Sequence, residues 1–253
     1  MADGGKEREM SFWDHLEELR GTLFRSILAV CLLAVLGFIF KQALFRLILL
    51  PASPDFAVYH LLGWDFTLKM INVEMAAQFF VHLQAAFGVA LILAFPYIIW
   101  EIWRFIVPAL YDNERKAIGG AFFMATGFFY LGVAVGYFLV LPACVQFFLN
   151  YSVSPEVENS ITISSYMSMF TSTVLLVGVA FEFPTVIWAL SHIGILDRSM
   201  LRKGRRYAVV AVLVLAAIVT PADPLSMIVV AAPLYLLYEI SILMCPKNND
   251  IDR

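Results

Sequence analysis

Long apolar runs alternate with short polar segments along the whole of this 253-residue sequence. An apolar run of about 20 residues is long enough to cross the hydrocarbon core of a bilayer as an α-helix. Six runs are candidates for such helices, at about residues 22–40, 76–100, 117–141, 166–190, 207–220 and 225–243. The pattern predicts an all-α polytopic membrane protein, with a single domain over residues 1–253 and six transmembrane helices.

The runs differ in length. The run 207–220 and the first, uninterrupted part of the last run each hold about 14 residues, roughly 21 Å as a helix. Because a hydrocarbon core is about 30 Å thick, we expect these two short helices to lie in a locally thinned bilayer. The run 76–100 is longer than the core requires, and we expect it to tilt, to bend at Pro96 or to project from the lipid.

An amphipathic segment precedes the first span. Ser11 and Asp14 have the spacing of a capping box, in which each side chain caps the helix start. The apolar positions that follow repeat at helical spacing, at Phe12, Leu16, Leu19 and Leu23. We therefore expect a helix at the membrane surface that continues into the first span. Arg25 lies near the start of this span and is expected to extend toward the water.

The polar segments are expected to be loops and turns. We predict a long loop over residues 41–75, a water-facing platform over residues 101–116, a basic loop over residues 197–206 and a tight turn over residues 221–224. The third span is expected to end at Pro142, because proline interrupts a helix. Within that span, Gly132 and Gly136 form a GxxxG pair that permits close helix approach.

The distribution of basic residues predicts the orientation. With six spans, both termini lie on one side of the membrane, and 14 of the 17 Lys and Arg residues fall on that side. Cytoplasmic segments of membrane proteins carry an excess of Lys and Arg. We therefore expect both termini, the amphipathic segment and the platform to be cytoplasmic.

Composition excludes several other classes of protein. Hydrophobic residues make up 61% of the chain and charged residues 15%, which a soluble domain could not expose to water. The three cysteines form no CxxC motif, and the four histidines lie at unrelated depths, so neither a disulfide framework nor a metal site is predicted. No phosphate-binding loop or nucleophile motif is present. We expect no cofactor, no enzyme activity and no nucleic-acid partner.

Glu182 is the one acidic residue well inside a predicted span. A carboxylate at that depth is expensive, by about 2.5–3.5 kcal/mol on insertion scales, so a functional role is the default interpretation. A neutral acid bonded to a neighbouring helix is the alternative. The sequence leaves its partner open, and the candidates are His82, Gln84, Ser172 and Thr173.

Five short motifs, in order along the chain, resemble the TatC family of twin-arginine protein translocation. They are His15-Leu-Glu-Glu-Leu-Arg20, Phe105-Ile-Val-Pro-Ala-Leu-Tyr111, Glu114-Arg115, Phe181-Glu-Phe-Pro184 and Thr220-Pro-Ala-Asp-Pro224. The resemblance runs from about residue 11 to about residue 243.

This resemblance implies a cupped bundle of six helices in the bacterial cytoplasmic (inner) membrane. It implies a receptor that binds the twin-arginine signal peptides of folded cargo at the cytoplasmic face and exports the cargo with the proton-motive force. Its implied partners are single-span subunits of the TatA and TatB types, in an oligomeric complex within the lipid bilayer.

The resemblance also assigns roles to individual residues. The signal-peptide site falls on Glu18, Arg20, Phe105 and Glu114. The intramembrane acid is Glu182, and the structural or partner contacts are Pro51 and Asp223. This chain has Met227 at a position where some members of the family carry glutamine. A partner contact made through the glutamine side-chain amide is therefore not expected to be conserved in this chain.

Other interpretations of these residues stay open. Glu114 could be a first-turn acid that favours the helix dipole, Glu18 could lie on a solvated helix face, and Arg20 could pair with Glu17. Phe105 could be an aromatic residue of the membrane interface. A proton-coupled small-solute transporter that uses Glu182 is the alternative function, although no inverted repeat is evident.

Overall fold

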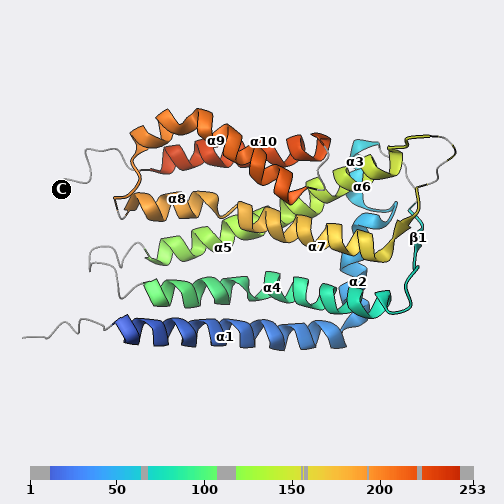
Figure 1. The fold of residues 1–253 in the computed structure, drawn as a ribbon, viewed down its shortest axis with the longest axis horizontal. Coiled ribbons are helices and arrows are strands. Elements are labelled where there is room, and N and C mark those ends of the chain that lie inside the picture. Colours follow the sequence, from blue (N-terminus) through green and yellow to red (C-terminus); the bar gives the residue numbers. More distant parts are fainter. Residues whose placement is uncertain are drawn as a thin grey trace, which may run out of the picture.

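The structure is a computed structural model, and it describes residues 12–63, 68–106, 118–154, 156, 159–192, 194–220 and 224–245. The described chain is a bundle of long helices that run roughly side by side (Figure 1). Helix α1 (Phe12–Ile39) packs along α4 (Ala77–Ile106), which contacts α5 (Ile118–Val135) and α7 (Ile163–Ala180). Helices α9 (Arg198–Val219) and α10 (Pro224–Met244) pack on each other at the far side of the bundle.

Four helical segments are long and apolar enough to cross a membrane. They are His15–Ile39, Ala77–Phe105, Gly120–Asn150 and Ile163–Ser191, and Met227–Leu243 is a shorter apolar helix. These segments confirm the prediction of a mostly helical membrane protein, although the chain also contains two short strands, which the all-α prediction did not include. The start of α1, the end of α4 and the end of α10 all lie at the same end of the bundle (Figure 1). The count of six spans and the cytoplasmic side of that end stay predictions.

The amphipathic segment and the first span form one continuous helix, α1, from Phe12. Ser11 lies outside the described residues, so the predicted capping box stays a prediction. Helix α4 likewise continues through Pro96 without interruption and extends to Ile106. The expectation that residues 101–116 form one polar platform is therefore wrong for residues 101–106, which are the last turns of α4.

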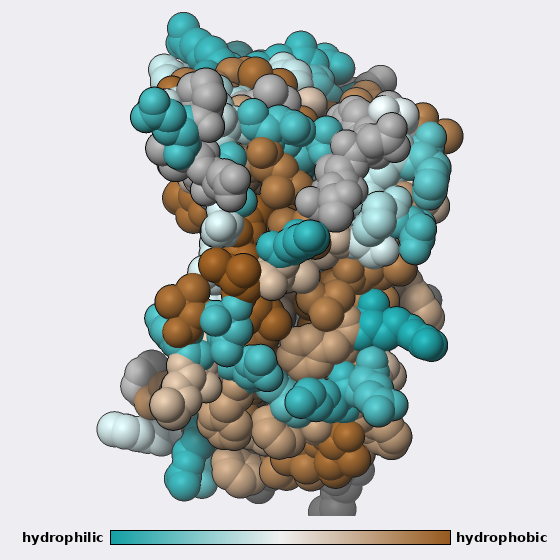
Figure 2. All heavy atoms as spheres, turned by 90° about the vertical axis from the view of Figure 1, so that its right-hand side faces the viewer, coloured by the Kyte–Doolittle hydropathy of each residue, from teal (hydrophilic) through white to brown (hydrophobic). Residues whose placement is uncertain are grey.

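The predicted loop 41–75 is mostly helical. It contains α2 (Lys41–Leu49), the 3-10 turn η1 (Leu50–Ala52), α3 (Ala57–Leu62) and the short strand β1 (Met70–Ile71). Apolar residues at helical spacing account for α2, because Leu44 and Ile48 are buried in the core. Strand β1 pairs in parallel with β2 (Ile161–Thr162), which closes this end of the bundle. Polar and apolar side chains intermix on the surface of that end (Figure 2).

Three tyrosine hydroxyls hold α2 and η1 against the bundle. Tyr59 donates to the Pro51 carbonyl at 2.5 Å, Tyr137 to the Leu47 carbonyl at 2.7 Å and Tyr166 to the Ile48 carbonyl at 2.7 Å. These bonds satisfy carbonyls at a helix C-terminus, which otherwise lack partners. Burial raises the pKa of Tyr59, so its hydroxyl remains a donor at neutral pH.

Pro142 does not end the third span, as was expected. Helix α5 continues through a π-helical segment, η4 (Gly136–Val140), into α6 (Leu141–Asn150). Proline clashes with the carbonyl four residues earlier, here that of Phe138. Residue 138 lies inside the π-helical segment, and such wider turns relieve this kind of clash. The helix therefore bends locally and goes on.

The fourth span is divided at Phe181 and Glu182, between α7 and α8 (Phe183–His192). Pro184 explains the division, because its ring disfavours a regular helix through residue 180. The predicted basic loop 197–206 is wrong as well. Residues from Arg198 onward belong to α9, in keeping with the high helix propensity of Arg and Lys.

The glycine pair permits the close helix approach that was expected. A Cβ atom on Gly132 would lie 2.6 Å from the Phe181 Cβ and 2.9 Å from the Gly178 Cα. At Gly136 the nearest atom of α7 is the Val174 Cα, at 3.2 Å. Helices α5 and α7 are thus in backbone contact where the fourth span divides.

We expect Gly132→Ala to destabilise the protein by about 1–3 kcal/mol, because overpacking forces backbone shifts. Gly127→Ala is the matched control, since nothing lies within 4 Å of a Cβ atom there. Alanine favours a helix over glycine by up to about 1 kcal/mol, so the control should be neutral or stabilising. Thermal unfolding in detergent measures both, and equal behaviour of the two variants would disprove the close contact.

Candidate functional site

The start of α1 and the end of α4 form the candidate site. Both lie at the same end of the bundle, and the two helices pack along each other over their length (Figure 1). This places the motif His15–Arg20 of α1 beside residues 101–106 of α4. The site is built on two helices, so its residues are fixed by the same packing that forms the fold.

An ion pair joins the two helices one to two turns inside the site. The Arg25 Nη2 atom lies 2.7 Å from the Glu101 Oε2 atom, and the Arg25 Nε atom donates to the same oxygen at 2.8 Å. The Glu101 side chain is 3% exposed and the Arg25 side chain 40%. The Arg25 guanidinium group is directed at Glu101, a partner that was not predicted from the sequence, and its extension toward water stays a prediction.

Two further residues belong to this ion pair. Arg25 Nη2 also donates to the Thr22 hydroxyl at 3.3 Å, and Tyr97 lies beside the Glu101 carboxylate, one turn earlier on α4. Sequence reasoning missed Glu101, which it assigned to the polar platform. The sequence did contain a signal for this pair. Arg25 is a lone base in one apolar run and Glu101 is a lone acid at the end of the next, and such residues tend to pair.

An aromatic contact lies closer to the end of the bundle. The His15 ring stacks on the Phe105 ring, with centroids 4.3 Å apart and an angle of 24° between the planes. His15 begins the first motif and Phe105 begins the second, so this contact brings the two motifs together. His15 was not singled out in the sequence, although it stands in the motif that suggested the site.

The structure describes three of the four residues predicted to bind a signal peptide. Glu18 lies three residues after His15 on α1 and is half-buried, Arg20 is exposed, and Phe105 is half-buried under His15. Glu114 lies outside the described residues. The structure therefore brings Glu18 and Phe105 to the same end of adjacent helices, and the contribution of Glu114 stays a prediction.

The chemistry available at this end suits a cation. Glu18 and Glu17 are carboxylates on the first turns of α1, and Glu17 is exposed. A carboxylate can accept two parallel hydrogen bonds from a guanidinium group. The stacked rings of His15 and Phe105 offer an apolar surface beside those acids.

Glu182 lies apart from that site, midway along the bundle where α7 ends (Figure 1). Its neighbours are the Thr185 side chain and the Phe129 backbone, from α8 and α5. The four partners proposed from the sequence are therefore wrong. The buried Glu182 Oε1 atom has no hydrogen-bond partner among the described residues.

The remaining predicted residues lie elsewhere. Pro51 is buried in η1 at the opposite end of the bundle, where its carbonyl accepts the Tyr59 hydroxyl. Asp223 lies outside the described residues. Met227 packs against the core cluster shared by α9 and α10. Within the described part of the chain, no three His, Cys, Asp or Glu side chains are placed to hold a metal ion.

Comparison with known proteins gives consistent matches. The model of the family TatC, Sec-independent protein translocase protein, matches residues 14–233. The chain is 36% identical to TatC of Blattabacterium sp. subsp. Periplaneta americana, over 94% of this chain and 95% of that protein. It is also 36% identical to TatC of Deinococcus radiodurans, over 92% of this chain and 84% of that protein.

Two solved structures are similar over nearly the whole chain. A crystal structure of the twin-arginine translocase receptor TatC has a TM-score of 0.74 and 31% identity, and covers 91% of this chain and 97% of that one. A second crystal structure of that receptor, in the detergent DDM, has a TM-score of 0.77 and 30% identity, and covers 92% of this chain and 99% of that one.

The ion pair leads to a prediction about stability. Removing one partner of a buried pair leaves the other charge without compensation, whereas removing both does not. We expect Arg25→Leu to lower the thermal unfolding midpoint, and the double variant Arg25→Leu/Glu101→Leu to recover at least about half of that loss. The measurement is thermal unfolding of the purified protein in detergent.

Arg20→Leu is the matched control, because it removes the same charge from an exposed position on the same helix. Its effect on the unfolding midpoint should be small. A double variant less stable than Arg25→Leu would contradict the ion pair as described.

Proposed function

This chain belongs to the TatC family of Sec-independent protein translocases, and we propose that it is the receptor subunit for twin-arginine signal peptides. Proteins of this family are translocase components rather than enzymes. In our proposal the signal peptide binds at the end of the bundle formed by the start of α1 and the end of α4. The supporting observation is the stacking of His15 on Phe105, at 4.3 Å, which joins the two motifs.

The proposed site would select arginine over lysine. Glu18, together with Glu114, would accept the two guanidinium groups of the motif. A guanidinium group forms two parallel bonds with a carboxylate, whereas an ammonium group acts as a point charge. Phe105 would contact the apolar residue next to the arginines, and Arg20 would complete the surface on α1.

The orientation and cellular setting follow from the same proposal. The end that carries Glu18 and Phe105 would face the cytoplasm, with both termini on that side and six spans in the bacterial inner membrane. The first turns of α9 contain five basic residues, Arg198, Arg202, Lys203, Arg205 and Arg206, at this end of the bundle. Single-span subunits of the TatA and TatB types would complete an oligomeric translocase for folded cargo, driven by the proton-motive force.

Glu182 would act in transport rather than in recognition. It lies at the division of α7 and α8, away from His15 and Phe105, with one buried oxygen that no described group bonds. Such an acid inside a span is a candidate for a step that follows binding. The family assignment favours this role over that of a proton site in a small-solute transporter, and uptake assays in proteoliposomes would distinguish the two.

The recognition site is tested by the affinity of an Arg-Arg signal peptide for the purified protein. We expect Glu18→Ala to weaken binding by roughly tenfold or more, because a hydrogen-bonded charge contributes about 1.5–3 kcal/mol. Glu17→Ala, which removes an exposed acid from the neighbouring position, should leave binding within about threefold. Fluorescence anisotropy of a labelled peptide measures both.

Replacing both peptide arginines by lysines should weaken binding to the wild-type protein more than binding to Glu18→Ala, in which only the contact with Glu114 remains to be lost. Equal binding of both peptides by the wild type, or equal losses in the Glu17 and Glu18 variants, would exclude the proposed acceptor.

Glu182→Gln tests the separation of recognition from transport. The substitution keeps the size of the side chain and removes its charge, so peptide affinity should stay within about twofold while export of folded cargo from cells falls. Export is measured as the fraction of a folded reporter that reaches the periplasm. A loss of peptide binding in a normally folded variant would place Glu182 in the recognition site instead.

A further inference from the structure

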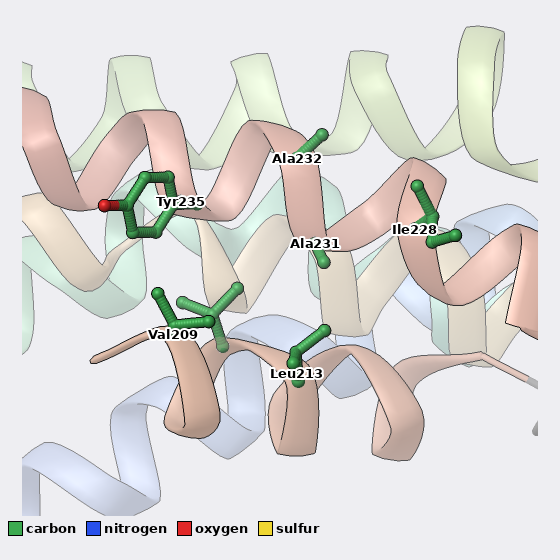
Figure 3. A pocket seen from close by; sticks show the side chains of 7 residues that line it. Val209, Leu213, Ile228, Ala231, Ala232 and Tyr235 are labelled. Carbon is green, nitrogen blue, oxygen red and sulfur yellow. The ribbon is translucent and has the colours of Figure 1, made fainter. Parts of the chain in front are cut away.

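A shallow apolar groove lies between α9 and α10. It has a volume of about 300 Å³ and is lined by Val209, Val212, Leu213, Ile228, Ala231, Ala232 and Tyr235. In Figure 3, Val209 and Leu213 of α9 lie opposite Tyr235 and Ala231 of α10, with the Tyr235 hydroxyl pointing along α10, away from Ala231. Every other lining group is aliphatic, so the groove suits a hydrocarbon.

The groove runs along the two helices. From Ile228 to Tyr235 it follows α10 for about 10 Å. Its lining is aliphatic apart from Tyr235, which suits an acyl chain lying along the groove.

A row of basic residues continues the groove beyond its Tyr235 end. Arg202, Arg206, Val209 and Leu213 follow each other at spacings of four, three and four, which places them on one face of α9. Arg202 and Arg206 are exposed, and neither has an acidic partner among the described residues. Arg206 also lies 5.1 Å from the Tyr207 ring centroid.

An acid on α10 beside this row is already paired. Glu239 on α10 pairs with Arg205 at 2.8 Å and accepts the Tyr235 hydroxyl at 3.2 Å. The Tyr238 hydroxyl donates to the Leu201 carbonyl at 2.5 Å, which fixes the two helices to each other at this end. The groove therefore ends in a fixed frame beside two arginines that have no acidic partner among the described residues.

We propose that α9 and α10 bind one anionic phospholipid, with its phosphate at Arg202 and Arg206 and one acyl chain in the groove. Apolar side chains of α9 outside the groove, such as Val210 and Val214, are 60% and 54% exposed, as expected for a surface that faces lipid tails. Basic residues next to such a surface attract anionic headgroups. The inference does not depend on the proposed function.

Native mass spectrometry of the purified protein tests this proposal with phosphatidylglycerol and phosphatidylcholine of identical acyl chains. We expect the wild type to retain one phosphatidylglycerol in preference to phosphatidylcholine. Arg202→Gln/Arg206→Gln should weaken phosphatidylglycerol binding about 30-fold, because each basic residue near an anionic surface contributes about fivefold. Phosphatidylcholine binding should change little.

Two further variants separate a built site from general attraction. Lys203→Gln removes one charge from the same turn but from another face of α9, so its effect should be smaller than that of either single arginine variant. Ala232→Phe should fill the groove and weaken phosphatidylglycerol binding although both arginines are present. Because Ala232 is exposed, the larger side chain should not disturb the core, and the variant should fold.

Equal retention of the two lipids by the wild type would overturn the proposal, as would equal effects of Lys203→Gln and Arg202→Gln. If Ala232→Phe bound phosphatidylglycerol as tightly as the wild type, the acyl chain could not lie in the groove, and that part of the proposal would be wrong. Photocrosslinking at Leu213 to a protein helix in native membranes, with no adduct to a photoactivatable phosphatidylglycerol, would assign the groove to a partner subunit and reject the lipid.

Discussion

The ion pair between Arg25 and Glu101 is the contact on which the candidate site depends. It joins α1 to α4 within the apolar part of the bundle, where a charge without a partner is costly. Because a buried pair adds little net stability over apolar packing, we interpret it as a device that fixes the axial position of α1 on α4. That position brings His15 onto Phe105 and sets the place of Glu18.

The rest of the bundle divides into regions with different physical constraints. At the opposite end, tyrosine hydroxyls hold the α2–η1 segment, which contains the buried Pro51. Between the ends, the close approach of α5 and α7 at Gly132 places Glu182 beside the Phe129 backbone. The proposed recognition site and the buried acid are thus held by separate contacts, so the proposal expects binding and transport to be altered independently.

The sequence predicted the four apolar spans that the structure contains, the glycine contact and the two motifs that meet in the site, because hydropathy and local spacing are properties of neighbouring residues. It did not predict the partner of Arg25 or of Glu182, since those contacts join residues far apart along the chain. The helical start of α9 and the helices within residues 41–62 were missed because charged or mixed segments were taken as loops. The continuation past Pro142 depends on a π-helical segment that no local pattern indicated.

The most direct test is to map where an Arg-Arg signal peptide touches the protein. A peptide with a photoreactive residue beside its two arginines is crosslinked to the protein in membranes, and the adducts are located by mass spectrometry. The account predicts adducts in the first turns of α1, near Glu18, and in the last turns of α4, near Phe105. Adducts confined to the Pro51 end of the bundle or to α9 and α10 would contradict it.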